Sequence, residues 1–206
     1  MTLDTQKRIL ETAKSTILEE ANAVQKLVQY LDEDFVTSVK TIFNSTGRLI
    51  ITGVGKSAII ANKIVATLNS TGTPSVFMHA ADAIHGDLGM IREKDIVLCI
   101  SKSGNTPEIK VLLPLIKRGG NKVIAMVSDV KSYLAEHSDY VLKATVSQEA
   151  CPNNLAPTSS TTAQLALGDA LAVCLLDLRG IDKNEIAKYQ PGGAIGKKKN
   201  MKVIYL

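Results

Sequence analysis

Three hydroxyl groups and a glycine crowd one short segment of the sequence, SKSGNTPE at residues 101–108. Ser101, Ser103 and Thr106 can each donate a hydrogen bond to a phosphate oxygen, and Gly104 lets the loop curl around the anion. A helix that begins at the following proline would add free backbone N–H groups and a partial positive charge. Capping of that helix would explain one hydroxyl but hardly three. The segment therefore predicts a site for a phosphate monoester that needs no metal.

A second loop that could bind an anion is GVGKSA at residues 53–58. It fails the P-loop pattern, because the residue five positions before Gly55 is Ile50 rather than a glycine. It fits the dinucleotide pattern Gly-x-Gly-x-x-Ala, but the acidic residue expected about 20 positions later is absent, and FMH stands at 77–79. No nicotinamide cofactor is therefore expected. A glycine turn that leads into an anion-binding helix explains the loop, and so does an ordinary turn with Ser57 as the cap.

Titratable groups that could move a proton lie in HAADAIHGDLG, residues 79–89. His79 and His85 can exchange a proton near neutral pH, and burial would tune their pKa values. Asp87 joins them in an alternative interpretation as three metal ligands. The three residues lack the compact helical spacing of a known metal site, so no metal is expected.

A further polar segment, QEACPNNLAPTSS, spans residues 148–160. Glu149 is an acid–base candidate within it. Cys151 is a candidate nucleophile for a Cys-His pair, but the proline that follows and the lack of a hydrolase motif argue against that pair. The hydroxyl run at 158–162 suits the capping of a long helix, an explanation that leaves Glu149 without a role.

These polar segments follow short apolar runs, which alternate with helical segments beyond Gly47. The alternation predicts an α/β fold, a three-layer α/β/α sandwich around a five-stranded parallel sheet. Ligands bind beyond the carboxyl ends of the strands in such a sheet, where the polar loops would meet. The expected strands are Leu49–Thr52, Ser75–Met78, Ile96–Ile100, Val123–Val127 and Tyr140–Leu142.

The first 46 residues are expected to form a helical N-terminal extension of that sheet. Apolar residues recur at helical spacing from Ile9 to Leu31, which predicts one amphipathic helix through about residue 30, and a second helix is expected at 32–46. Acidic and basic residues mix on the polar face of the first helix, which suits packing or oligomerisation rather than DNA binding. The later helices are expected at Ser57–Ser70, Thr106–Arg118, Ser132–His137 and Ser160–Arg179, the last ending at Gly180.

Length and composition limit the class of protein. The chain has 206 residues, 45% of them hydrophobic, which suits one globular domain with a buried core. The net charge of +4 arises from 24 basic and 20 acidic residues spread along the chain, so no nucleic-acid partner is expected. No apolar run approaches the roughly 20 residues of a membrane span, and the first residues lack a signal-peptide core, so no membrane is expected either. Cys99, Cys151 and Cys174 lack CxxC spacing and are expected to be reduced, as in a cytoplasmic protein.

Taken together, GVGKSA, HGDLGM, SKSGNTPEI, EACPNNLAPTSSTT, GDALAV and PGGAIG resemble the sugar isomerase (SIS) domain family. Within that family they are similar to the arabinose-5-phosphate isomerases of bacterial lipopolysaccharide biosynthesis. The resemblance runs from about Gly47 to Gly196 and implies a flavodoxin-like SIS fold. It also implies interconversion of D-ribulose 5-phosphate and D-arabinose 5-phosphate without a cofactor, to supply 3-deoxy-D-manno-octulosonate (Kdo). Alternatives are another SIS phosphosugar isomerase and a non-catalytic sugar-phosphate sensor.

The resemblance also implies roles for individual residues. The substrate phosphate would be bound by Gly55, Ser57, Ser101, Ser103 and Thr106. Catalytic roles would fall to Lys56, His79, His85, Glu108 and Glu149. Aldose–ketose isomerisation passes through an enediolate, so it needs a base and a group that faces the developing oxyanion. We expect His85 or Glu149 to be the base and Lys56 to stabilise the enediolate, with Lys56 and Lys102 as the lysines that face the anionic substrate.

The chain departs from the family pattern at Gln190, which precedes Pro-Gly-Gly where family members usually carry a histidine. If that histidine is the usual base, another titratable group must replace it here. The chain also ends without the cystathionine-β-synthase-type (CBS) domains that many members carry. We therefore expect a single domain, with N-terminal helices at 1–46, a phosphosugar-binding core at 47–196 and a basic tail at 197–206.

Two expectations concern regulation and assembly. Without regulatory domains, inhibition by a Kdo-containing pathway product would have to act at the active site. The family resemblance implies a homotetramer, in which the first helix and the segment after Tyr189 reach into neighbouring subunits.

Overall fold

A parallel sheet organises the structure, a computed structural model that describes residues 2–182, 185, 186 and 188. Its strands are β1 (Leu49–Gly53), β2 (Ser75–His79), β3 (Ile96–Ile100), β4 (Val123–Val127) and β5 (Tyr140–Lys143), in the spatial order β2-β1-β3-β4-β5. All five predicted strands are present, and three extend one residue beyond the predicted end. Every residue of β1, β3 and β4 is buried, which explains why these runs are continuously apolar rather than alternating.

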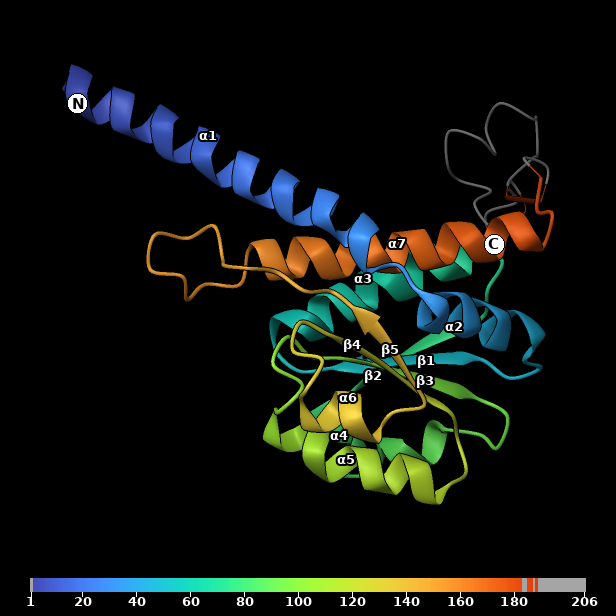
Figure 1. The fold of residues 1–206 in the computed structure, drawn as a ribbon. Helices are drawn as coiled ribbons and strands as arrows, with labels where there is room; N and C mark the ends of the chain where they lie inside the picture. The colour runs from blue at the N-terminus through green and yellow to red at the C-terminus, as the bar shows by residue number, and fades with distance from the viewer. Residues whose placement is uncertain (1, 183–184, 187, 189–206) are drawn as a thin grey trace, which may run out of the picture.

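Helices cover both faces of the sheet, so the predicted three-layer α/β/α fold is confirmed (Figure 1). One face carries α2 (Glu33–Asn44), α3 (Lys56–Ser70) and α7 (Ser159–Leu178). The other carries α4 (Ala80–Ala83), α5 (Pro107–Arg118) and α6 (Tyr133–His137). The sequence does not predict α4 or the 3₁₀ turn Asp87–Met90, because four residues are too few to show a periodic pattern.

The N-terminal helix α1 (Leu3–Lys26) extends away from the sandwich and packs against α7 near its own C-terminal end (Figure 1). Within α1 only Ala23 is buried, and Glu20 accepts a hydrogen bond from the Thr162 hydroxyl at 2.9 Å. The prediction of one α-helix through residue 30 is wrong in its last turn. There the chain tightens into a 3₁₀ helix, Leu27–Tyr30, which brings Leu27 into the core.

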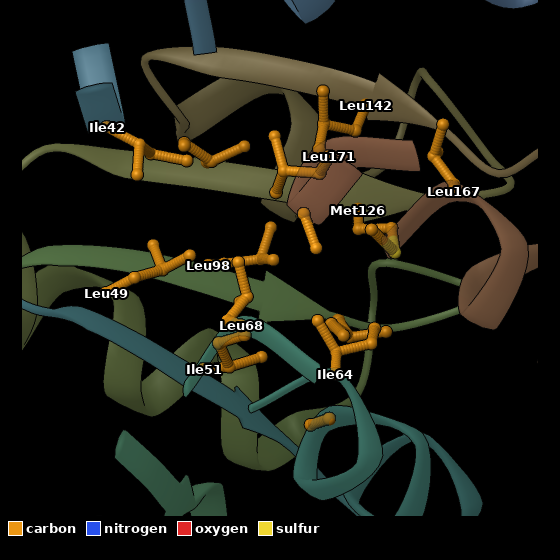
Figure 2. Packing of buried hydrophobic residues seen from close by; sticks show 14 of the residues in the cluster. Ile42, Leu49, Ile51, Ile64, Leu68, Leu98, Met126, Leu142, Leu167 and Leu171 are labelled. Carbon is orange, nitrogen blue, oxygen red and sulfur yellow. The ribbon is translucent and has the colours of Figure 1, made fainter. Parts of the chain in front are cut away.

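The core between the sheet and the layer of α2, α3 and α7 is built from aliphatic side chains (Figure 2). Ile51 and Leu98 contribute from the strands and Leu171 from α7. Gly168 lets α7 approach α3 closely, because a Cβ atom there would lie 2.3 Å from Cδ1 of Ile64. The backbone of α7 at Gly168 therefore packs directly against the side chain of Ile64 on α3, which fixes the positions of the two helices relative to each other.

Helix α7 is long and apolar enough to cross a membrane, with a mean hydropathy of 1.4 over an 18-residue window. Its buried residues, among them Leu167, Leu171 and Leu175, belong to the aliphatic core. A helix that packs within a protein core passes the same test of length and composition. Packing in the core thus accounts for the part of this window that is buried, 39%.

The amino edge of the sheet is closed by an ion pair between Arg48 and Asp95. The Arg48 Nη2 atom lies 2.6 Å from Asp95 Oδ2 and also donates to the carbonyl oxygen of Met90 at 2.7 Å. Asp95, which is 2% exposed, accepts further hydrogen bonds from the backbone N–H groups of Arg48 and Arg92. Burial raises the pKa of Asp95, but these hydrogen bonds outweigh it and leave the pKa below its ordinary value.

Candidate active site

A cavity of about 370 Å³ opens beyond the carboxyl ends of β1 and β3. This is the point where the sheet connections diverge, because β1 continues into α3 on one face and β3 into α5 on the other. The cavity is lined by Val54, Lys56, Ser57, Ile100, Ser101, Lys102, Ser103, Thr106, Pro157, Ser160 and Thr161. The two predicted anion loops therefore face the same space.

Three helices begin at this cavity, α3, α5 and α7, and none of them is capped by the side chain of its own N-cap residue. By contrast α1, α2 and α6, whose residues do not line the cavity, are capped by Thr2, Asp32 and Ser132, although the four-residue α4 also lacks such a cap. An uncapped start leaves N–H donors and the positive end of the helix dipole available to an anion. The cavity thus offers a positive electrostatic environment and N–H donors to a bound anion.

The SKSGNT loop is shaped by its own hydroxyls. The Ser101 and Thr106 hydroxyls lie 2.9 Å apart, and Ser101 Oγ accepts the N–H of Gly104 at 3.1 Å. Gly104 adopts a φ of +62°, and a Cβ atom there would lie 2.0 Å from Ser132 Oγ, so glycine is required at this turn. Thr106 is the N-cap residue of α5 but its hydroxyl binds Ser101 instead of the helix, so capping does not explain these hydroxyls.

The glycine loop after β1 turns into α3 at Gly55, which has a φ of +58°. Lys56 and Ser57 are the first two residues of α3 and both line the cavity. The Ser57 hydroxyl donates a hydrogen bond to Oε1 of Gln164 on α7, at 3.3 Å. It does not cap the backbone of α3. The interpretation of Ser57 as an ordinary capping serine is therefore wrong.

Glu149 lies behind the cavity wall, with a fully buried side chain. Its Oε1 accepts from Lys102 Nζ at 2.6 Å and from the Ser160 hydroxyl at 2.5 Å. Its Oε2 accepts from the backbone N–H groups of Thr158 and Ser160 at 2.8 and 3.1 Å, and from the Thr158 hydroxyl at 3.3 Å. The carboxylate of Glu149 therefore caps α7 from a distance, in place of the hydroxyl run expected to do so, and the starts of α3 and α5 remain for an incoming anion.

These contacts make Glu149 a strongly stabilised anion. Burial raises the pKa of Glu149, but hydrogen bonds from Lys102, Ser160 and the backbone of Thr158 outweigh it and lower the pKa to about 2. A carboxylate that accepts five hydrogen bonds and has so low a pKa is a weak base. In this state Glu149 is better suited to stabilising the structure as a fixed anion than to abstracting a proton.

The remaining catalytic candidates lie outside the cavity walls of one copy of the chain. His79 ends β2 in register with Gly53, and its Nδ1 lies 3.6 Å from an oxygen of Asp82. His85 is exposed in the loop after α4. Glu108 is half-buried in the first turn of α5, where a carboxylate also suits the helix dipole. Of the five predicted catalytic residues, only Lys56 lines the cavity; Glu149 lies behind its wall in contact with Lys102, and Glu108 and the two histidines are not among the lining residues.

The residues of the two alternative sites, a metal centre and a Cys-His pair, do not come together in the part of the chain that the structure describes. His79, His85 and Asp87 form no metal-binding group among the described residues. Cys151 Sγ accepts the N–H groups of Leu155 and Ala156, both at 3.1 Å, and its described hydrogen bonds include no histidine.

All three cysteines are unpaired, in agreement with the sequence expectation. The expectations that concern Gln190, the segment after Tyr189 and the tail at 197–206 lie outside the described residues.

Sequence reasoning missed two features of the site. Pro157, Ser160 and Thr161 line the cavity, although none of them was predicted as a site residue and capping was expected to explain part of the hydroxyl run at 158–162. The pairing of Lys102 with Glu149 was also missed, because it joins residues 47 positions apart. One available signal was the number of hydroxyls at 158–162, which exceeds what one helix cap needs, as it does in the SKSGNT loop.

The sequence and the fold both resemble those of known proteins. The family model for the SIS domain matches residues 42–174. Arabinose 5-phosphate isomerase KdsD of Pseudomonas aeruginosa is 49% identical over 194 residues, which cover 94% of this chain and 60% of that protein. KdsD of Yersinia pestis is 46% identical over 188 residues, covering 91% of this chain and 57% of that protein. The chain thus spans about three fifths of the length of these curated relatives.

A solved structure, that of E. coli CFT073 c3406 in complex with arabinose 5-phosphate, superposes with a TM-score of 0.86. It is 37% identical in sequence, and the match covers 93% of this chain and 100% of that one. The similarity therefore extends over the whole of a chain whose structure has been solved with a sugar phosphate.

Proposed function

The chain belongs to the SIS domain family, and on that premise we propose that it interconverts D-ribulose 5-phosphate and D-arabinose 5-phosphate. One observation carries the proposal. A cavity with a hydroxyl loop, two lysines and uncapped helix starts lies where a sugar phosphate would bind, in a chain 37% identical to a protein solved in complex with arabinose 5-phosphate. The curated relatives that carry the name arabinose 5-phosphate isomerase support the choice of sugar.

The cavity suits a substrate that is anionic at one end. The hydroxyls of Ser57, Ser101, Ser103 and Thr106 and the N–H groups at the starts of α3 and α5 would bind the phosphate, with Gly55 shaping the turn. The phosphate is remote from the reacting carbons, so its binding energy would position C1 and C2 for proton transfer.

The chemical step needs a base and an electrophile. Lys56, which lines the cavity, would stabilise the enediolate oxygen through its ammonium group. The saturated contacts of Glu149 favour His85 over Glu149 as the base that moves the proton between C1 and C2. His85 lies on an exposed loop at the same edge of the sheet, so it would reach the cavity from a neighbouring copy or by movement of that loop. His79 at the end of β2 and Glu108 in the first turn of α5 would assist the proton transfer.

The direct test is an assay of ketose formation from arabinose 5-phosphate, with and without a chelator. Turnover by the wild-type protein that is insensitive to chelator supports the proposal. His85→Ala should then lower kcat by about 100-fold or more, the usual contribution of a general base. Tight binding of the sugar phosphate without turnover would contradict the proposal and indicate a sensor.

We also propose that the protein acts as a homotetramer. Leu3, Leu10, Ile17 and Leu18 of α1 are each at least 60% exposed, which is costly for a helix that remains alone. A neighbouring copy would cover them and bring its own loops near the cavity. Light scattering should give four times the mass of the chain, and a monomer at micromolar concentration would contradict the assembly.

The metabolic role follows from the same substrate. We propose that the product feeds the synthesis of Kdo and lipopolysaccharide in the cytoplasm, where the reduced cysteines would be stable. A Kdo-containing product is a carboxylate sugar, so it would compete for the positive cavity. Inhibition should therefore be competitive with arabinose 5-phosphate, and a purely noncompetitive pattern would contradict competition at this site.

A further inference from the structure

Lys102 lines the cavity, but the proposed mechanism gives it no individual role. It leaves the SKSGNT loop after β3, and its ammonium group reaches the buried carboxylate of Glu149 at the start of α7. Lys102 lines the cavity together with Ser101 and Ser103, and its side chain is 42% exposed. The contact thus joins the phosphate loop to the start of a helix that covers one face of the sheet.

The ammonium group of Lys102 keeps part of its hydrogen-bonding capacity. A lysine ammonium carries three N–H donors, and among the described residues one of them goes to Glu149. The other two belong to an exposed group that borders the cavity beside the hydroxyls of the SKSGNT loop. A dianionic phosphate on those hydroxyls would lie within reach of a second charge-assisted hydrogen bond.

Hydrogen bonds fix the carboxylate of Glu149 in the position from which it binds this ammonium group. Every described partner of its carboxylate is a donor, from Lys102, Thr158 and Ser160, so the oxygen atoms are fixed on both sides. Its side chain has no exposed surface from which to touch a substrate. Glu149 therefore fixes Lys102 in place while remaining outside the cavity.

We propose that Lys102 is a ligand of the substrate phosphate and that Glu149 is the positioning residue that holds its ammonium group at the cavity. The identity of the sugar phosphate rests on the proposed function, whereas the phosphate contact itself does not. Lys102 would then add binding energy at the end of the substrate remote from the reacting carbons, so its loss should raise KM more than it lowers kcat.

The test compares Lys102→Met, Glu149→Gln and the double variant, with kcat and KM for arabinose 5-phosphate. Lys102→Met should raise KM by about 30-fold, the range of a hydrogen bond between charged groups, with kcat within about threefold. Glu149→Gln should raise KM by about 10-fold, and the double variant should be no worse than Lys102→Met because the two act as one unit. Lys102→Arg, which keeps the positive charge but changes the geometry of the donors, should restore only part of the affinity.

A lysine elsewhere in the fold provides the matched control. Lys63 lies 2.7 Å from Asp169 across α3 and α7, and it is not among the residues that line the cavity. Lys63→Met removes the same charge from the chain but should leave KM within about twofold, because Lys63 does not line the cavity and solvent screens the effect of an exposed charge on a distant anion. Equal KM increases for Lys63→Met and Lys102→Met would mean that net charge, rather than a contact, is responsible, and would overturn the proposal.

The pH profile separates positioning from catalysis. The charged group in contact with Glu149 is Lys102 from the β3–α5 loop, the carboxylate also accepts from N–H groups at the positive end of α7, and Lys56 lines the same cavity as Lys102. If Glu149 only positions Lys102, Glu149→Gln keeps the shape of the acidic limb of kcat/KM. Loss of that limb, with kcat reduced more than about 100-fold and KM unchanged, would identify Glu149 as the base and overturn its assignment.

Calorimetric titration with inorganic phosphate and with arabinose 5-phosphate keeps this inference separate from the proposed function. A wild-type protein that binds both ligands, with affinity lost in Lys102→Met, supports the phosphate contact even if no sugar is turned over. Turnover with a Kd and KM unaffected by Lys102→Met would leave the isomerase intact and overturn the role of Lys102. Circular dichroism of each variant checks that the fold is retained.

Discussion

Two buried carboxylates, at opposite edges of the same sheet, show how similar geometry can serve different purposes. Asp95 at the amino edge and Glu149 at the carboxyl edge each lie 2.6 Å from a cation. At Asp95 the cation is an arginine that is 26% exposed and whose Nη2 atom also donates to a backbone carbonyl, so it joins two parts of the fold. At Glu149 it is a lysine that is 42% exposed and faces a cavity. The Arg48–Asp95 pair stabilises a connection within the fold, whereas the Lys102–Glu149 pair holds a positive charge at the cavity.

The choice of cation follows from this difference. Arginine holds several donors in a rigid plane and can satisfy two acceptors at once, whereas lysine is a point charge with rotatable donors. A pair that only stabilises the fold benefits from the rigid fork. A pair that also has to meet an incoming anion benefits from donors that remain free.

The largest effect that tests the comparison is on stability. Arg48→Met should lower the free energy of unfolding by about 4 kcal/mol, because it leaves the buried Asp95 without its cation. Lys102→Met should cost only about 1 kcal/mol, since Glu149 keeps four hydrogen bonds from Thr158 and Ser160, whereas Asp95 would keep only the two from backbone N–H groups. Urea unfolding of both variants measures the difference. Equal losses would mean that the two pairs play the same structural part.

A smaller effect should appear in the pH dependence of stability. The folded pKa of Glu149, about 2, lies below its ordinary value of 4.5, so Glu149 stabilises the fold above about pH 4.5 and this contribution is lost as the pH falls toward 2. Between pH 6 and pH 3 the loss is about 2 kcal/mol at 1.36 kcal/mol per unit.

Glu149→Gln should flatten the acid limb of the stability curve by that amount. Asp95 acts in the same direction in both proteins, because its pKa is also lowered, so the difference between the two curves isolates Glu149. Thermal unfolding at a series of pH values supplies the comparison. Parallel curves for wild type and variant would show that Glu149 has no depressed pKa.

The smallest expected effect on stability tests whether burial decides the strength of an ion pair. Lys63 and Asp169 form a pair of 2.7 Å whose side chains are 46% and 40% exposed. Lys63→Ala should change the free energy of unfolding by less than about 0.5 kcal/mol, because solvent screens an exposed pair. A loss above about 1.5 kcal/mol in urea unfolding would show that distance rather than burial decides the strength of these pairs.

Local sequence patterns predicted most of the fold and the anion loops. Continuous apolar runs identified all five strands because both faces of the sheet are covered, and the hydroxyls of Ser101 and Thr106 identified one wall of the cavity. Each of these features is encoded within a short stretch of the chain.

The features that sequence reasoning missed depend on distant partners. The capping of α7 by Glu149 acts across a turn whose shape no periodicity records. The Lys102–Glu149 pair depends on β3 and α7 being brought to the same edge. His85 was expected near the reacting carbons from its motif, but its distance from the cavity is set by the path of the loop after β2.

The uncapped start of α5 has a consequence for protein engineering. Aspartate is a better N-cap than threonine, so Thr106→Asp is a substitution that a designer would choose to raise the melting temperature. The new carboxylate would occupy the N–H groups intended for the phosphate and would repel it. Heat resistance gained at this position should therefore come with lost affinity for sugar phosphates, and stabilising substitutions are better placed at the far edge of the sheet.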